Sequence, residues 1–399
     1  MIKKREERKY NLFYIEITLL ILFMGVLRNG NLNLIYFSVP IFLIKACQKK
    51  QKILTEIMWM YIPILLAFFI TVLFSPYFSN MEKSIIYILK IFLCIILFVC
   101  VRNTEYQYDT QKIMSYLEYS IFFLTIIAIL TQNEYLWRFN DDVNKYATNR
   151  LQLFFQEPSE LSEVCGVLLI IHVYFLKIDV EKRYIKLLLI LIPLILSAGL
   201  SGLVYSAISI VCFFILTEIP SLKRGKMSQI FAIFISIVFI LILGIILFPN
   251  NAIILRINDV LNGNDSSFNY RFTRAFQALV RLLKDTRFIG VGFGNLRTDY
   301  MQIYLWENFR LHSFSNSYFF FIAEGGIIAL FFLIGLIFST YFKIKKINVN
   351  YINKVARVTL LLFIVIFQIT GGYFTDSFLW LITALIASKT FLRSEKNDL

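Results

Sequence analysis

The sequence predicts an all-α, polytopic membrane protein with about twelve transmembrane helices. Hydrophobic residues make up 58% of the 399 residues, the mean hydropathy is +0.69, and long apolar runs with 41 phenylalanines recur from end to end. A soluble domain of this length cannot cover so much apolar surface. The runs also lack the alternation expected of membrane β-barrel strands. We therefore expect a single integral membrane domain over residues 1–399.

The individual spans follow from the length of each apolar run, because a helix needs roughly 20 residues to cross the hydrocarbon core. They lie near residues 11–28, 32–47, 54–75, 83–101, 113–130, 161–176, 184–198, 202–218, 228–248, 315–342, 357–370 and 375–392. The apolar block 184–218 is divided at Ser197–Gly202, since its small residues permit a tight re-entry.

Basic clusters set the predicted orientation in the cell membrane. With the N-terminus inside, the inner loops hold Lys49–Lys52, Lys177–Lys186, Lys223–Lys226 and Lys343–Lys346, as the positive-inside tendency requires. Both termini are then cytoplasmic. The same tendency accounts for most of the net charge of +14. Because the sequence contains no soluble basic domain, nucleic acid is not expected as a partner.

Two loops on the outer side are long enough to carry chemistry. The first extracytoplasmic loop covers residues 131–160, and the second covers 249–314 between late spans. The second carries seven arginines on the side where basic loops are disfavoured. Arginine forms paired hydrogen bonds with phosphate oxygens, so the loop indicates an anionic ligand, with lipid phosphates the first candidates.

The first loop ends in a helix start at Pro158-Ser159, directly after Glu157. Glu157 has two interpretations. It can belong to the cap of the sixth span, or it can be a surface carboxylate that accepts a proton from a substrate hydroxyl, with Arg150 nearby in sequence. The sequence leaves both open.

The second loop contains an amphipathic helix near residues 268–284, with apolar side chains on one face and arginines on another. These are Phe272, Phe276, Leu279 and Leu283, and Arg271, Arg274 and Arg281. The pattern predicts a helix lying in the membrane interface. Its arginines can touch lipid headgroups, or they can bind a diphosphate in a geometry that lysine cannot copy.

Three further elements follow in the same loop. Gly290 and Gly292 indicate a tight turn that approaches either a ligand or a neighbouring helix. His312 lies near the end of the loop, and imidazole suits proton transfer near neutral pH. Asn316 and Tyr318 stand where the loop enters the next span.

Taken in order, these elements resemble the O-antigen polymerase and ligase superfamily. They are Arg150, the run Phe155-Gln156-Glu157-Pro158-Ser159, the break Ser197–Gly202, Arg271, Gly290-Val291-Gly292, Asn316-Ser317-Tyr318 and Ala323-Glu324-Gly325-Gly326. Their order and spacing are similar to those of Wzy-type polysaccharide polymerases over residues 145–330.

The resemblance implies a membrane glycosyltransferase that needs neither a cofactor nor a metal. Such enzymes polymerise undecaprenyl-diphosphate-linked repeat units into capsule, exopolysaccharide or O-antigen on the outer face of the membrane. The implied partners are these lipid-linked glycans, membrane lipids, a chain-length regulator and a flippase. Arg271 and Arg274 would stabilise the leaving diphosphate, and either Glu157 or His312 would be the base. The substrate-binding candidates are Arg150, Arg281, Gly290, Gly292, Asn316 and Tyr318.

Two alternatives remain. Ligase-like members of the superfamily often have histidine directly before the Asn316 element, where this chain has Ser315 and places His312 three residues earlier. This departure weighs against an O-antigen-type ligase. A lipid-linked glycan flippase or transporter needs charged side chains inside several spans. The sequence shows few of them, which favours an enzyme at the outer face.

Overall fold

The computed structural model of the protein describes residues 52–103, 109–139, 149–178, 185–218, 268–371 and 374–392, and the single positions 19, 21, 39, 259 and 262. The predicted spans near 11–28, 32–47 and 228–248 lie outside this part. The helices are α3 (Lys52–Phe74), α4 (Met81–Arg102), α5 (Thr110–Thr131), α6 (Pro158–Lys177), α7 (Ile185–Leu196), α8 (Leu200–Glu218), α12 (Ala275–Asp285), α13 (Asp299–Phe309), α14 (Ser317–Lys346), α15 (Tyr351–Thr370) and α16 (Ser377–Ala387).

Each of the nine predicted spans that fall on described residues contains a helix, so the all-α class is confirmed and the helices are compatible with a polytopic membrane protein; the count of twelve spans is not confirmed. Among the described residues, seven helices are long and apolar enough to cross a membrane, while α7 and α16 are shorter apolar helices. The predicted division at Ser197–Gly202 is also confirmed, because α7 ends at Leu196 and α8 begins at Leu200.

Short polar side chains begin several of these helices by accepting hydrogen bonds from the first backbone N–H groups. The N-cap residues that do so are Asn80 for α4, Asp109 for α5, Asn316 for α14, Asn350 for α15 and Asp376 for α16. At α6, Pro158 occupies the first turn, where its missing N–H costs nothing.

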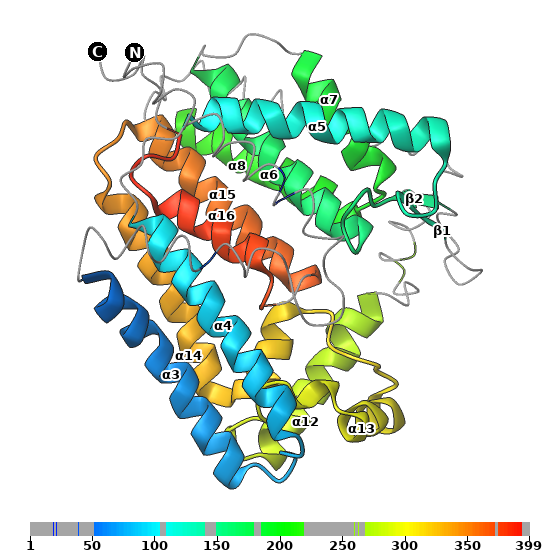
Figure 1. Cartoon of the computed structure of the whole chain (residues 1–399), viewed down its shortest axis with the longest axis vertical. Coiled ribbons are helices and arrows are strands. Elements are labelled where there is room, and N and C mark those ends of the chain that lie inside the picture. The colour runs from blue at the N-terminus through cyan, green and yellow to red at the C-terminus, as the bar shows by residue number, and fades with distance from the viewer. Residues whose placement is uncertain are drawn as a thin grey trace.

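The helices form two groups joined by α15 and α16 (Figure 1). On one side, α3 packs against α4 and α14. On the other, α6 packs against α7 and α8, and α5 packs against α7. Between them, α15 contacts α6, α8, α14 and α16, while α16 packs against α4. The buried core is therefore shared between helices that are distant in sequence.

One face of α3 is an exposed apolar stripe at helical spacing. It consists of Leu54, Met58, Ile62, Leu66, Phe69 and Leu73, each between 44% and 70% exposed. Exposing an apolar stripe of this length to water would carry a large unfavourable free energy. We conclude that it is the lipid-facing side of a membrane-spanning helix.

The two loops contain elements that the sequence patterns did not predict. In the first, β1 (Trp137–Phe139) pairs antiparallel with β2 (Asn149–Leu151). In the second, a π-helix, η2 (Asn269–Arg274), precedes α12, and a 3-10 turn, η3 (Asn295–Arg297), precedes α13.

The predicted apolar face of the amphipathic segment is partly wrong. The buried side chains of α12 are Ala275, Ala278, Leu279 and Leu282, and α12 packs against α13 and α14. Phe276 instead is 55% exposed. Within α12 the buried side is centred on Ala278 and Leu282, so Phe276 lies at its edge, where its ring centroid is 6.0 Å from that of Phe319.

Candidate functional site

The ends of α6, α14, α15 and α16 meet near Arg271, one of the predicted site residues. The Gln368 amide, near the end of α15, donates to Glu163 Oε1 of α6 at 3.3 Å. The hydroxyl of Ser317, the first residue of α14, donates to Gln368 Oε1 at 2.6 Å, and the Gly371 carbonyl oxygen lies 3.0 Å from the same hydroxyl. All three side chains are buried. This network joins the beginnings of α6 and α14 to the end of α15, and we call it the Glu163 junction.

Arg271 lies against the same junction. Its Nη1 donates to the Thr370 carbonyl, the last residue of α15, at 2.6 Å. The residue belongs to the π-helix η2, a rare conformation that occurs frequently at functional sites. Arg274, from the same segment, is exposed. The fold thus holds Arg271 by its guanidinium at the end of a membrane-spanning helix.

Carboxylates surround the other side of the junction. Glu160 and Asp376 are close enough to Glu163 to interact with it electrostatically. Asp376 caps α16, and Glu160 accepts the backbone N–H of Gln156 at 3.0 Å. Glu157 occupies the N-cap position of α6 without capping it, is exposed, and accepts a hydrogen bond from Ser159 at 3.1 Å. Its side chain is thus at the surface, as the proton-acceptor interpretation requires.

Arg150 lies on β2 beside the first turns of α6. It donates to the carbonyls of Ser197 and Ala198 at 3.0 and 3.4 Å. These carbonyls belong to the break between α7 and α8. Gly199 and Gly202 lie so close to Ser162 that an added Cβ would approach its atoms to 2.4 and 2.6 Å. The small residues of the break therefore let α8 begin directly against α6, and Arg150 fixes that arrangement.

His312 is tied to the π-helix through Tyr270. The phenol of Tyr270 donates to the Ser313 carbonyl at 2.9 Å and accepts the backbone N–H of His312 at 3.0 Å. The imidazole itself stacks on Trp306, with ring centroids 4.3 Å apart and planes at 16°. Arg271 and His312 therefore come from adjoining segments, but the His312 ring faces Trp306.

Arg281 is held by an acidic partner rather than by the junction. Its Nε lies 3.0 Å from Asp285 Oδ2, which also accepts hydrogen bonds from Tyr77 and Tyr304. The charge of Asp285 raises the pKa of Arg281. Partial burial and these hydrogen bonds raise the pKa of Tyr77, so this phenol stays protonated and donates. The position of the Arg281 side chain is therefore explained by this local cluster around Asp285.

The two glycines of the Gly290 segment approach a neighbouring helix, one of the two partners that the sequence left open. Val291 and Gly292 donate backbone hydrogen bonds to the carbonyls of Ala323 and Glu324, both at 2.9 Å. In return, Ile327 donates to the Phe288 carbonyl at 2.9 Å. A Cβ on Gly290 would lie 2.4 Å from the Glu324 carbonyl oxygen.

A kink in α14 makes this pairing possible. Gly326 has φ 62 and ψ −148, a backbone region open almost only to glycine. The helix is interrupted there, so backbone groups next to Gly326 form hydrogen bonds with the Gly290 segment. The buried Glu324 carboxylate accepts the Gly294 N–H at 2.8 Å and interacts electrostatically with Arg297. Gly294 and Arg297 belong to the loop, residues 287–298, that pairs with α14, while Tyr87 of α4 also interacts with this carboxylate.

Replacing Gly326 with alanine is expected to undock this loop. The added Cβ would lie 2.2 Å from the Phe288 carbonyl oxygen and would force an L-residue into a glycine-only conformation. We expect a loss of about 1–3 kcal/mol of stability, measured by thermal unfolding in detergent, with faster proteolysis within residues 287–298.

Gly335 in the same helix supplies the matched control. Its Cβ would meet no atom within 4 Å, so Gly335→Ala is expected to be neutral or stabilising by about 0.5–1 kcal/mol. Equal behaviour of the two variants would contradict the docking role of Gly326.

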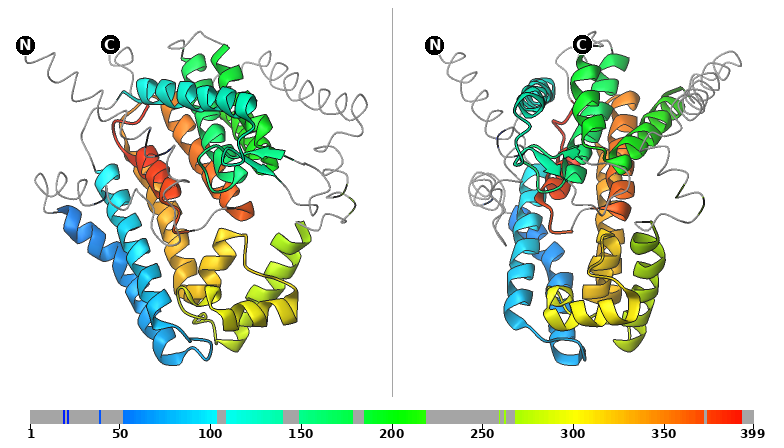
Figure 2. Two further views of the ribbon diagram at one scale, coloured as in Figure 1. Left: turned by 45° about the vertical axis from the view of Figure 1, so that its right-hand side comes forward. Right: turned by 90° about the vertical axis from the view of Figure 1, so that its right-hand side faces the viewer.

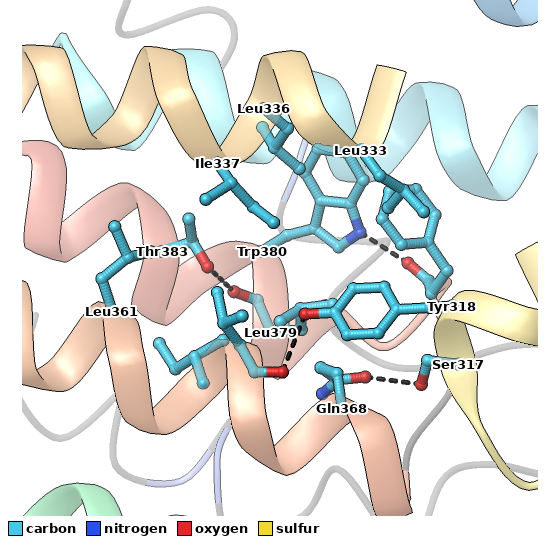
Figure 3. A pocket seen from close by; sticks show the side chains of 13 residues that line it. Ser317, Tyr318, Leu333, Leu336, Ile337, Leu361, Gln368, Leu379, Trp380 and Thr383 are labelled. Carbon is cyan, nitrogen blue, oxygen red and sulfur yellow. Dashed lines mark hydrogen bonds between the residues drawn. The ribbon is translucent and has the colours of Figure 1, made fainter. Parts of the chain in front are cut away.

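Asn316 and Tyr318 have structural partners at the start of α14. Asn316 caps the helix, and the Tyr318 phenol donates to the Val365 carbonyl at 2.9 Å. Tyr318 also lines a cavity of about 40 Å³ with Ser317, Gln368 and Trp380 (Figure 3). This volume accommodates a few water molecules.

A second polar cluster, which sequence reasoning missed, lies inside the bundle at the opposite end of α6. The buried Glu118 carboxylate of α5 is 3.4 Å from His172 Nδ1 and 4.0 Å from Lys186 Nζ, and Lys186 also donates to Ser115 at 3.0 Å. His172 lies on α6. Its partners stand on two other helices, so only the packing brings them together.

The sequence signal for Glu163 and Gln368 was their polarity within apolar runs, since buried polar groups in membrane helices require partners. That signal did not indicate that the two side chains are partners of each other.

Comparison of the chain with protein-family models and with curated proteins gives no match to either.

Proposed function

We propose that the protein polymerises glycan repeat units carried on a lipid diphosphate, at the outer face of the membrane. The observation that carries this proposal is Arg271, presented by a π-helix at the Thr370 carbonyl, beside the converging first turns of α6, α14 and α16. A guanidinium favours an anion. The ordered sequence elements that resemble Wzy-type polymerases supply the substrate class.

The reaction requires little beyond positioning and charge stabilisation. The bond between the donor sugar's anomeric carbon and the diphosphate oxygen breaks, and the acceptor hydroxyl oxygen bonds to that carbon. Negative charge collects on the departing diphosphate, where Arg271 and the exposed Arg274 can stabilise it. The hydroxyl proton passes to a base, for which Glu157 and His312 stay the candidates.

Deletion of the gene tests the proposal in the source cell. Loss of a polymerase is expected to leave single repeat units displayed outside, because flipping continues while chain growth stops. The measurement is the length of the surface glycan on a gel, with surface labelling of the single units. Complementation with the full-length gene should restore the polymer. A surface glycan of unchanged length distribution would refute the assignment.

Transport of a lipid-linked glycan is a second candidate, and the Glu118 cluster is the observation that favours it. Buried ionisable side chains on three helices are expected along a transport path more than in an outer-face enzyme. The same deletion separates the two functions, since a transporter's loss leaves the repeat units trapped on the inner leaflet.

A further inference from the structure

Helix α13 exposes an aromatic face at one end of the molecule. It runs across the end of the bundle rather than along α3 and α4 (Figure 2). It buries Met301 and Leu305 completely, yet Tyr300, Ile303 and Trp306 are 56%, 58% and 42% exposed. These three are spaced by three residues and therefore share one side of the helix. An exposed face of this kind is typical of an interaction surface.

The start of α13 is fixed to the turn between α3 and α4. The buried Asn295 side chain, just before α13, accepts the backbone N–H groups of Ser79 and Asn80 at 2.9 and 3.0 Å and donates to Ser84 at 2.9 Å. Lys83 Nζ donates to the Arg297 carbonyl at 2.9 Å. These hydrogen bonds hold α13 at the level where α3 ends and α4 begins.

The exposed face continues the lipid-facing stripe of α3. That stripe ends in Leu73 and Phe74, 70% and 69% exposed, directly before the turn. Tyr77 in the turn then packs against α13, with ring centroids 6.5 Å from Tyr300 and 5.4 Å from Tyr304. The apolar surface thus passes from a helix that must face acyl chains to one that lies across its end.

The charged residues on this side of α13 set its depth. Asp299 and Glu307 are exposed and each is four residues from Ile303, so they share its side of the helix. Because carboxylates are costly in the acyl core, this side lies no deeper than the headgroup layer. At the other end, the exposed Arg310 lies over the Trp306 ring at 5.6 Å, where its guanidinium can reach a phosphate. Tryptophan and tyrosine are enriched at the headgroup level because each ring combines an apolar body with a polar edge.

We infer that α13 is an interfacial anchor whose Tyr300–Ile303–Trp306 face lies in the phospholipid headgroup layer, with Arg310 on lipid phosphate. The anchor holds the Gly290 segment and the His312 segment at a fixed height on the bilayer. It does not depend on the proposed function, because it rests on the contacts of α13 with the turn between α3 and α4.

Tryptophan quenching tests this inference on the full-length protein in phosphatidylcholine vesicles. The fluorescence of Trp306 is obtained as the difference between the protein and its Trp306→Phe variant. Nitroxide-labelled phosphatidylcholine supplies the quencher, with the label either near the headgroup or near the end of the acyl chain. We expect Trp306 to be quenched more strongly by the shallow label and to be shielded from iodide in the aqueous phase.

Two other tryptophans calibrate the result. Trp59, 70% exposed on α3, should be quenched by lipid labels, whereas Trp380, 1% exposed, should respond to none. Strong iodide quenching of Trp306 without lipid quenching would show that the face is in water. Insensitivity to every quencher would show that a protein or glycan covers it. Either outcome overturns the anchor.

Discussion

Under the proposed function, an Arg271→Lys variant is expected to lose most polymer synthesis while remaining folded in the membrane. Lysine keeps the charge but lacks the planar, paired donors that can bond to a phosphate and to the Thr370 carbonyl together. Loss of one preorganised donor typically lowers the rate by about 10²–10³-fold, or about 3–4 kcal/mol in the barrier. The measurement is the length distribution of polymer made by membranes that contain the variant.

Arg287→Lys is the matched control, since Arg287 is an exposed arginine near the end of α12 that the site does not use. Its polymer should match the wild type. Both variants should give the same amount of protein and the same monodisperse elution in detergent. Normal chain length with Arg271→Lys, at normal protein level, would remove Arg271 from the mechanism.

The largest loss of stability is expected for Arg357→Met. Arg357 is completely buried in α15, and its guanidinium donates to Asn353 Oδ1 at 2.6 Å, to the Ile386 carbonyl at 2.8 Å, and to the carbonyls of Ser388 and Phe391. Each buried acceptor left without a partner costs about 1–3 kcal/mol. We therefore expect a total loss of at least about 3 kcal/mol, seen as earlier thermal unfolding in detergent.

The neighbouring lysine tests whether charge removal alone causes the loss. Lys354 is only partly buried and contacts one carbonyl, of Lys345, at 3.3 Å. Lys354→Met should change stability by no more than about 0.5 kcal/mol. A comparable loss for the two methionine variants would contradict the idea that Arg357 holds the segment after α16.

Hydropathy predicted the spans well because a bilayer constrains both the length and the polarity of a helix. The break at Ser197–Gly202 was also accessible, since glycine and serine mark close packing, although only the structure shows Ser162 as the partner. By contrast, the π-helix at Arg271 could not be predicted from the sequence. It changes the hydrogen-bond spacing by one residue, which leaves no mark in the apolar pattern.

The sequence also did not reveal which residues are the partners of the buried polar groups. Glu163 and Gln368 are 205 residues apart, and neither periodicity nor local motif relates them. Gly290 and Gly292 indicated a close approach correctly, yet the same pattern fits a ligand and a helix equally well. The roles of Arg271, Arg274, Glu157 and His312 stay predictions, because they depend on a substrate.

The Asn295 side chain also constrains how the protein is made. Its hydrogen-bond partners, in the turn after α3 and in the first turn of α4, are separated from it by more than 200 residues, so the hairpin of α3 and α4 is synthesised long before Asn295. Until then, the N–H groups of Ser79 and Asn80 lack this acceptor. Biogenesis therefore includes a late closing step, in which the nascent chain returns to a hairpin that was inserted early.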